Sequence, residues 1–134
     1  MPSSSDPISF ETVLESQYSG IRTPRRAVIR DAEQWRAFVR EATNVDGANP
    51  AAPAEFDFTR EMAIVAAMGM RRSGGYSIAI ENIFSAEGKL RVVVREVAPK
   101  TGSMTTQALT APLVVVRLAR SNDPVSFVER PDEL

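Results

Sequence analysis

Alternation of apolar and polar residues predicts a β-hairpin in the second half of the chain. Residues 76–84, YSIAIENIF, place apolar side chains at every second position, and residues 89–97, KLRVVVREV, repeat the pattern. A period of two is typical of strands that bury one face. Ala86-Glu87-Gly88 lies between them, and its glycine accepts a positive φ, so this segment is predicted to form the turn.

A helical pattern precedes the hairpin. Asp31 is a residue type that caps helix N-termini, and Gln34 three residues later fits a capping-box variant, in which both side chains bind free amides of the first turn. The apolar residues that follow have helical spacing: Trp35, Phe38, Val39 and Ala42. We therefore predict one main helix that packs on a sheet through this stripe.

The other apolar segments predict strands. They are residues 8–18, 26–31, 62–69, 111–120 and 124–130. Pro124 opens the last of them, which suits an edge position. In consecutive antiparallel order these segments predict an α+β domain, with a mainly antiparallel sheet of about five to seven strands and the helix on one face.

Domain boundaries follow from the same pattern. Residues 1–7 are expected to be a flexible N-terminal tail, and residues 8–134 a single domain. Residues 44–56 are rich in Pro, Ala and Gly and are predicted to form a loop.

Composition narrows the range of functions. Of 134 residues, 43% are hydrophobic and 25% charged, and the formal net charge of −1 gives no electrostatic case for a nucleic-acid partner. No apolar run approaches the roughly 18 residues that indicate a membrane span. The first residues lack a positive region followed by an apolar one, so the sequence as written predicts a cytoplasmic protein, or an exported one if its N-terminus was trimmed.

Cysteine and histidine are both absent, which removes the commonest catalytic groups. A thiolate nucleophile, a zinc–cysteine site and an imidazole base are excluded. The best remaining arrangement is a Ser/Lys enzyme that uses Ser103 and Lys100. Because a lysine in a polar loop is usually only solvated, we expect no enzyme, no catalytic residue, no metal site and no cofactor.

Two loops are unusual. Residues 71–76, RRSGGY, combine two guanidinium groups with glycines, the ingredients of an anion nest, although a Gly-Gly pair before a strand more often sets a turn. Residues 98–112 exceed the usual hairpin loop of about 2–5 residues. We expect Met104 and Leu109 to pin this second loop to the core.

The motifs in these loops form a specific combination. They are Arg72, Ser73, Gly74, Gly75, Tyr76 and Ile78, then Pro99, Gly102, Met104, Thr106, Gln107, Ala108, Leu109, Thr110 and Pro112, and finally Val125, Phe127 and Val128. With the Trp35 helix, they resemble the PrcB-like family, the C-terminal domain found in the protease complex subunit PrcB. Two positions depart from the family pattern: Ser103 stands where Cys is frequent, and Leu113 where an aromatic residue is common.

The resemblance implies a non-catalytic protein-interaction module, an accessory or stabilising subunit that associates with a protease. Its contact surface is expected on the two loops, at Arg71, Arg72, Ser73, Gly74, Gly75, Tyr76, Gly102, Ser103, Met104, Thr106 and Gln107. The glycines would let a partner approach the backbone closely, and Tyr76 would serve as an amphipathic anchor.

Several alternatives remain. The SGGY segment is similar to the Thr-Gly-Tyr loop of chagasin-like inhibitors of cysteine proteases, which implies an inhibitor. An anion or small ligand would instead bind residues 71–76. In a purely structural interpretation, Gly74-Gly75 forms a turn and Gln107 bonds to its own loop. A homodimer would use exposed strand edges at residues 113–119 or 125–128.

Overall fold

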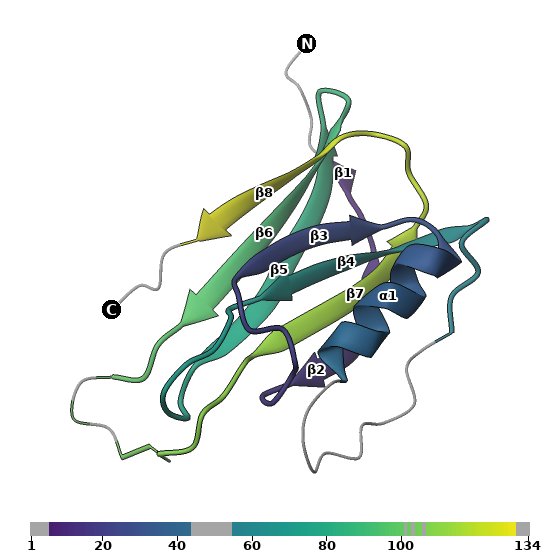
Figure 1. Ribbon diagram of the computed structural model, residues 1–134. Helices are drawn as coiled ribbons and strands as arrows, with labels where there is room; N and C mark the ends of the chain where they lie inside the picture. The colour runs from purple at the N-terminus through teal and green to yellow at the C-terminus, as the bar shows by residue number, and fades with distance from the viewer. Residues whose placement is uncertain (1–5, 44–54, 101, 103, 106, 131–134) are drawn as a thin grey trace.

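The computed structural model describes residues 6–43, 55–100, 102, 104–105 and 107–130. Among these residues it has one helix and eight strands (Figure 1). In chain order they are β1 (Asp6–Pro7), β2 (Phe10–Ser16), β3 (Arg25–Ile29), α1 (Ala32–Ala42), β4 (Glu61–Ala67), β5 (Ser77–Ala86), β6 (Lys89–Val97), β7 (Leu113–Ala119) and β8 (Val125–Arg130).

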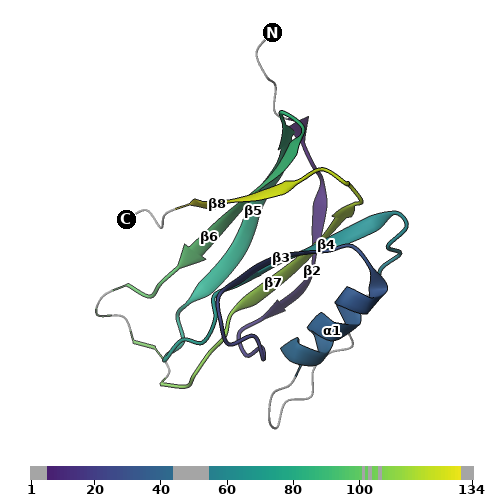
Figure 2. The same cartoon turned by 45° about the horizontal axis from the view of Figure 1, so that its top comes forward.

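The strands form two four-stranded sheets. The first has the order β1-β5-β6-β8 and the second the order β2-β7-β4-β3. Figure 2 shows α1 on the face of the second sheet that is turned away from the first. The α+β class with mainly antiparallel pairing is confirmed, with a somewhat higher strand count than predicted.

The predicted consecutive order of strands is wrong. β7 lies between β2 and β4, and β8 pairs with β6 in parallel. The reason is that the chain crosses from the second sheet to the first between Ala119 and Val125, so β8 runs in the same direction as β6. β8 is an edge strand, as its opening proline indicated.

Strands β4 and β7 are buried on both faces. In β4, Met62, Ile64 and Ala66 pack against the first sheet, while Ala63 and Val65 belong to the cluster beneath α1. This two-sided burial explains why residues 62–68 are a continuous apolar run without alternation. The second sheet is therefore the central layer of a three-layer domain.

Helix α1 begins as predicted. The Asp31 side chain accepts a hydrogen bond of 2.8 Å from the Gln34 amide. In a capping box the Gln34 side chain would accept from the Asp31 amide. Here the Gln34 Oε1 accepts instead from the Arg30 amide, one residue earlier, at 3.1 Å. Trp35 and Phe38 are buried against the second sheet, and the Phe56 ring packs edge-on to Trp35.

The predicted hairpin joins β5 and β6. Its turn is Glu87-Gly88, with φ values of 55° and 76°, as in a two-residue type I′ turn. An irregularity between Ile80 and Asn82 shifts the alternation, so that Ile83 rather than Asn82 continues the buried face.

The segment 6–16 joins the two sheets along one side of the domain. Asp6 and Pro7 pair with β5, and the same segment then becomes β2 beside β7. Of the predicted tail, residues 1–5 lie outside the described residues. Asp6 and Pro7 form a short strand instead, because their backbone extends the edge of the first sheet.

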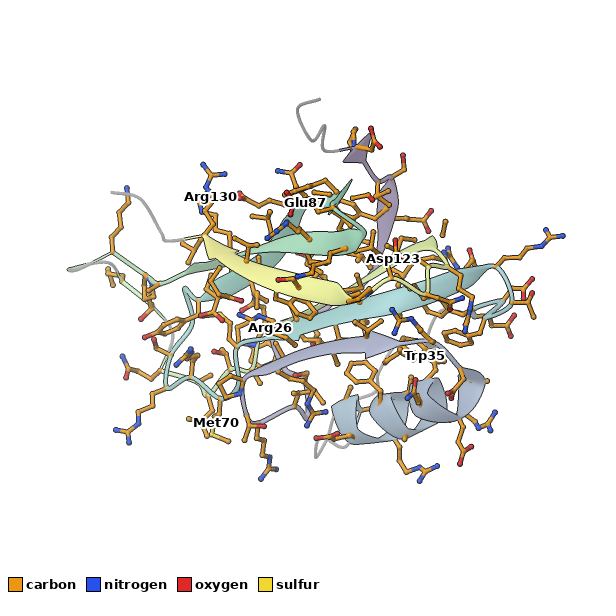
Figure 3. All side chains as sticks on the ribbon, turned by 90° about the horizontal axis from the view of Figure 1, so that it is seen from above. Arg26, Trp35, Met70, Glu87, Asp123 and Arg130 are labelled. Atoms are coloured by element: carbon orange, nitrogen blue, oxygen red, sulfur yellow. The ribbon has the colours of Figure 1, made fainter. Side chains whose placement is uncertain are left out.

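On the other side of the domain, an arginine ties the two sheets together. The Arg26 guanidinium on β3 reaches Glu96 on β6 at 2.6 Å and Glu129 on β8 at 2.8 Å. It also donates to the Ala67 carbonyl at 2.9 Å. Figure 3 shows Arg26 between β3 and β8. Burial alone would lower the pKa of Arg26, but the hydrogen bonds and charges of the two carboxylates raise it on balance.

The preceding residue ties the sheet to the helix. Arg25 points to the opposite face of β3 and binds both carboxylate oxygens of Glu41, at 2.6 and 2.7 Å. This hydrogen bonding lowers the pKa of Glu41, more than its slight burial raises it. Neighbouring arginines on one edge strand therefore link all three layers.

We expect Arg26→Met to lower the free energy of unfolding by about 2 kcal/mol, because it leaves partly buried Glu96 without its closest cation. The matched variant Arg25→Met breaks a more exposed pair and should cost about 0.5–1 kcal/mol. Urea unfolding measures both values. Equal losses in the two variants would contradict a special role for Arg26.

The Arg25–Glu41 pair also predicts a pH dependence. Since the folded pKa of Glu41 lies below its ordinary value of 4.5, the pair stabilises the fold above that value and loses this effect as the pH falls through the folded pKa. The stability difference between wild type and Arg25→Met should thus be constant at neutral pH and vanish in acid. A difference that persists unchanged at the lowest pH would exclude Glu41 as its origin.

Candidate functional site

Three segments that are distant in sequence meet at one end of the domain. They are residues 17–24, 68–76 and 98–112, and we call their described part the tip. Two of its loops lie at the lower left of Figure 1, where β4 ends and β7 begins. The tip thus brings together both loops that the sequence singled out, together with the connection between β2 and β3.

Backbone hydrogen bonds hold these segments together. Arg71 and Thr110 exchange bonds of 2.7 and 2.9 Å between their amides and carbonyls. The Ala111 amide donates to the Gln17 carbonyl at 2.7 Å, and the Met70 amide to the Arg22 carbonyl at 3.0 Å. The three segments therefore form one bonded unit.

Buried hydroxyl groups reinforce the unit. The Thr110 side chain is 3% exposed, and its Oγ1 donates to the Ser73 carbonyl at 2.8 Å. The Ser19 hydroxyl donates to the Ala111 carbonyl at 2.9 Å. These bonds satisfy polar groups that water does not reach.

Glycines allow the loops to approach closely. Gly75 has φ of +90°, and a Cβ at this position would lie 2.8 Å from the Pro99 Cβ and 3.0 Å from the Thr105 Cγ2. Gly75 therefore packs directly against the second loop, and its positive φ also sets the entry to β5. This geometry agrees with the turn interpretation of the Gly-Gly pair.

The two arginines of the first loop have different surroundings. The Arg71 guanidinium lies over the Tyr76 ring, 5.4 Å from its centroid, and 4.0 Å from Glu96. Arg72 is exposed. The Arg71 guanidinium is therefore already engaged by Tyr76 and Glu96 within the protein.

The predicted contact residues differ in exposure. Arg71, Ser73, Gly74 and Tyr76 are half-buried, and the exposed members are Arg72, Gly75, Gly102, Met104 and Gln107. Ser103 and Thr106 lie outside the described residues. The structure therefore places the described members at one end of the molecule, and their role in binding stays a prediction.

The prediction that Met104 and Leu109 pin the second loop to the core is wrong. Met104 is 100% exposed and Leu109 is 58% exposed. The loop is held instead by the backbone bonds of Thr110 and Ala111 and by the contact between Pro99 and Gly75. The Met104 and Leu109 side chains are thereby left facing solvent.

Sequence reasoning missed two members of this exposed surface. Tyr18 is 56% exposed and Met70 is 43% exposed, and each lies in a tip segment. Of the five large apolar side chains that are exposed in the described part of the chain, four belong to the tip, and the fifth is Val128. The only sequence signal was that Tyr18 and Met70 follow the ends of apolar runs.

Of the two strand edges proposed for a homodimer, only one is an edge in the structure. Residues 113–119 form β7, which is paired on both sides and offers no edge. Residues 125–128 belong to β8, whose outer side is the edge of the first sheet. Pro124 had indicated an edge position for residues 124–130, but no comparable signal placed residues 113–119 inside a sheet.

Other candidate chemistry lies away from the tip or is incomplete. Lys100 is exposed, and its proposed partner Ser103 is outside the described residues. A hollow of about 500 Å³ beside Arg117 lies at the opposite end of the domain. The Arg117 guanidinium there is bound to Glu11 at 2.6 Å and lies 3.5 Å from Glu61. Within the described ranges, no helix is long and apolar enough to cross a membrane.

Gly75→Ala should lower the free energy of unfolding by about 1–3 kcal/mol, because strain at positive φ adds to the clash with Pro99. Gly102→Ala is the matched control, since its φ is +86° but nothing lies within 4 Å of an added Cβ. The control should cost only about 1 kcal/mol. Equal values in chemical unfolding would show that the two loops do not pack tightly at Gly75.

Comparison with known proteins gives a family match that includes both loops singled out in the sequence. The model of the family described as PrcB C-terminal matches residues 62–119, from β4 to β7. No curated protein and no solved structure was found to match the chain. The matched residues include two of the three tip segments and both loops that carried the resemblance. Residues 62–119 of this chain thus match the PrcB C-terminal family, as the sequence motifs indicated.

Proposed function

We propose that this protein is a non-catalytic interaction module that binds a protein partner through its tip, as an accessory or stabilising subunit of a protease. The observation that carries the proposal is the concentration of exposed apolar side chains at one end: Tyr18, Met70, Met104 and Leu109. Large apolar side chains that cluster on a surface mark interaction sites.

The tip is also held in a defined shape. Its three segments are joined by backbone bonds of 2.7 to 3.0 Å at Met70, Arg71, Thr110 and Ala111. A surface ordered before binding loses less conformational entropy when it meets its partner. Tyr76, half-buried under Arg71, supports this arrangement rather than acting as a free anchor.

A protease complex is the setting that the family match supports. The match to PrcB C-terminal spans both loops of the tip that precede and follow the hairpin. The absence of His and Cys from the sequence supports a non-catalytic role. The partner would then supply the catalytic groups, and this chain would supply a surface.

The test compares capture of partners by wild type, by Met70→Asp/Leu109→Asp, and by Val128→Asp. Val128, at 38% exposure, is an exposed apolar residue outside the tip and serves as the matched control. Wild type and the Val128 variant should recover a protease from source-cell extract. The tip variant should recover at least about tenfold less, because charge is buried in an apolar contact.

Circular dichroism and urea unfolding must first show that all three baits are folded. Recovery of the same partners by all three, or of no protease by any, would overturn the proposal. The activity of the recovered protease then separates two roles. A longer lifetime at unchanged activity indicates a stabilising subunit, whereas loss of activity indicates an inhibitor of the chagasin-like kind.

A further inference from the structure

Charge is unevenly distributed between the tip and the rest of the chain. Residues 17–24, 68–76 and 98–112 contain four basic residues, Arg22, Arg71, Arg72 and Lys100, and no Asp or Glu. The whole chain has sixteen basic and seventeen acidic residues. The remainder therefore carries twelve basic against seventeen acidic residues, and the net charge of −1 hides a positive end.

Three of these four cations are directed to solvent. Arg22, Arg72 and Lys100 are exposed, and no ion pair involving them is found within the described ranges. Arg71 is the exception, since it lies 4.0 Å from Glu96, just outside the tip. The Glu96 carboxylate is in turn held by Arg26 at 2.6 Å. The Glu96 carboxylate, which is the negative charge near Arg71, is thus already paired within the protein.

The cations belong to the same three tip segments as the exposed apolar side chains. Arg22 accepts the Met70 amide through its carbonyl, and Arg72 lies two residues from Met70. Lys100 and Met104 belong to the same loop. An apolar centre with charged neighbours is the usual anatomy of a protein interface, in which peripheral charge selects the partner and speeds association.

We infer that the partner presents an acidic surface with exposed apolar groups to the tip. This inference rests on the proposed function and specifies the chemistry of the partner's face. A protein surface is favoured over an anionic membrane because polar groups are interspersed among the apolar ones. Gln107 is exposed in the sequence between Met104 and Leu109, and burying its amide in hydrocarbon would be costly without hydrogen-bond partners.

The experiment uses the full chain and a labelled peptide that contains glutamate and leucine in equal number. The control peptide replaces every glutamate with lysine, and mixed phosphatidylcholine–phosphatidylserine vesicles form a third probe. Fluorescence anisotropy should rise with the acidic peptide alone. The affinity should fall with added salt, because exposed charges are screened within about 10 Å at 0.1 M ionic strength.

Charge-reversal variants locate the binding surface. Arg72→Glu/Lys100→Glu should weaken binding of the acidic peptide about tenfold. Arg36→Glu/Arg40→Glu changes the net charge equally at exposed positions of α1 and should leave affinity within about twofold of wild type, since this face is not the proposed contact.

Equal binding of both peptides, equal loss in both charge variants, or binding to vesicles alone would overturn the inference. No binding to any probe would do the same. These outcomes are distinct from failure of the proposed function. If a protease is recovered through Met70 and Leu109 but Arg72→Glu/Lys100→Glu recovers it equally, the tip is an interface and the acidic partner face is wrong.

Discussion

The three layers pack through the apolar clusters on the two faces of the second sheet, and two adjacent arginines of an edge strand link all three. Successive side chains of a strand point to opposite faces, so Arg25 reaches Glu41 on α1 while Arg26 reaches Glu96 and Glu129 on the first sheet. On the opposite side of the domain, residues 6–16 pass from one sheet to the other. On the side of β3 and β8, residues 120–124 make a second crossing that is bonded by Arg30, and Arg26 bridges the two sheets directly.

The same tie extends towards the tip. Glu96 accepts from Arg26 at 2.6 Å and lies 4.0 Å from Arg71, whose guanidinium covers the Tyr76 ring. The connection between the sheets therefore continues into the first loop through alternating charges. Together with the backbone bonds between Arg71 and Thr110 and the packing of Pro99 on Gly75, these contacts hold the first loop beside the second. Arg71 thus has side-chain contacts that are not found for Arg72 in the described part of the chain.

Local signals in the sequence predicted the elements that depend on neighbouring residues. Asp31 and Gln34 placed the helix start, and Ala86-Glu87-Gly88 placed the hairpin turn to within one residue, since Ala86 ends β5. Pairing between distant strands was not predictable in this way. Pro124 indicated that β8 lies at an edge, but no local signal showed that β7 lies between β2 and β4. Tyr18 and Met70 were missed for a related reason. Their exposure depends on bonds between distant segments, from the neighbours of Tyr18 to Ala111 and from Met70 to Arg22, which the linear pattern does not contain.

A partner could meet two surfaces, the tip and the outer edge of β8, and they differ in whether their backbone groups are already hydrogen-bonded. At the tip, the amides of Met70, Arg71, Thr110 and Ala111 are already bonded within the domain. At these four positions a partner meets side chains rather than free amides, so recognition there uses the apolar and basic groups that the tip presents. The outer edge of β8 instead offers unpaired backbone groups, which favour strand addition with little selectivity for sequence. The proposed recognition of a protease would use the first kind of surface, which lies where three segments are bonded together.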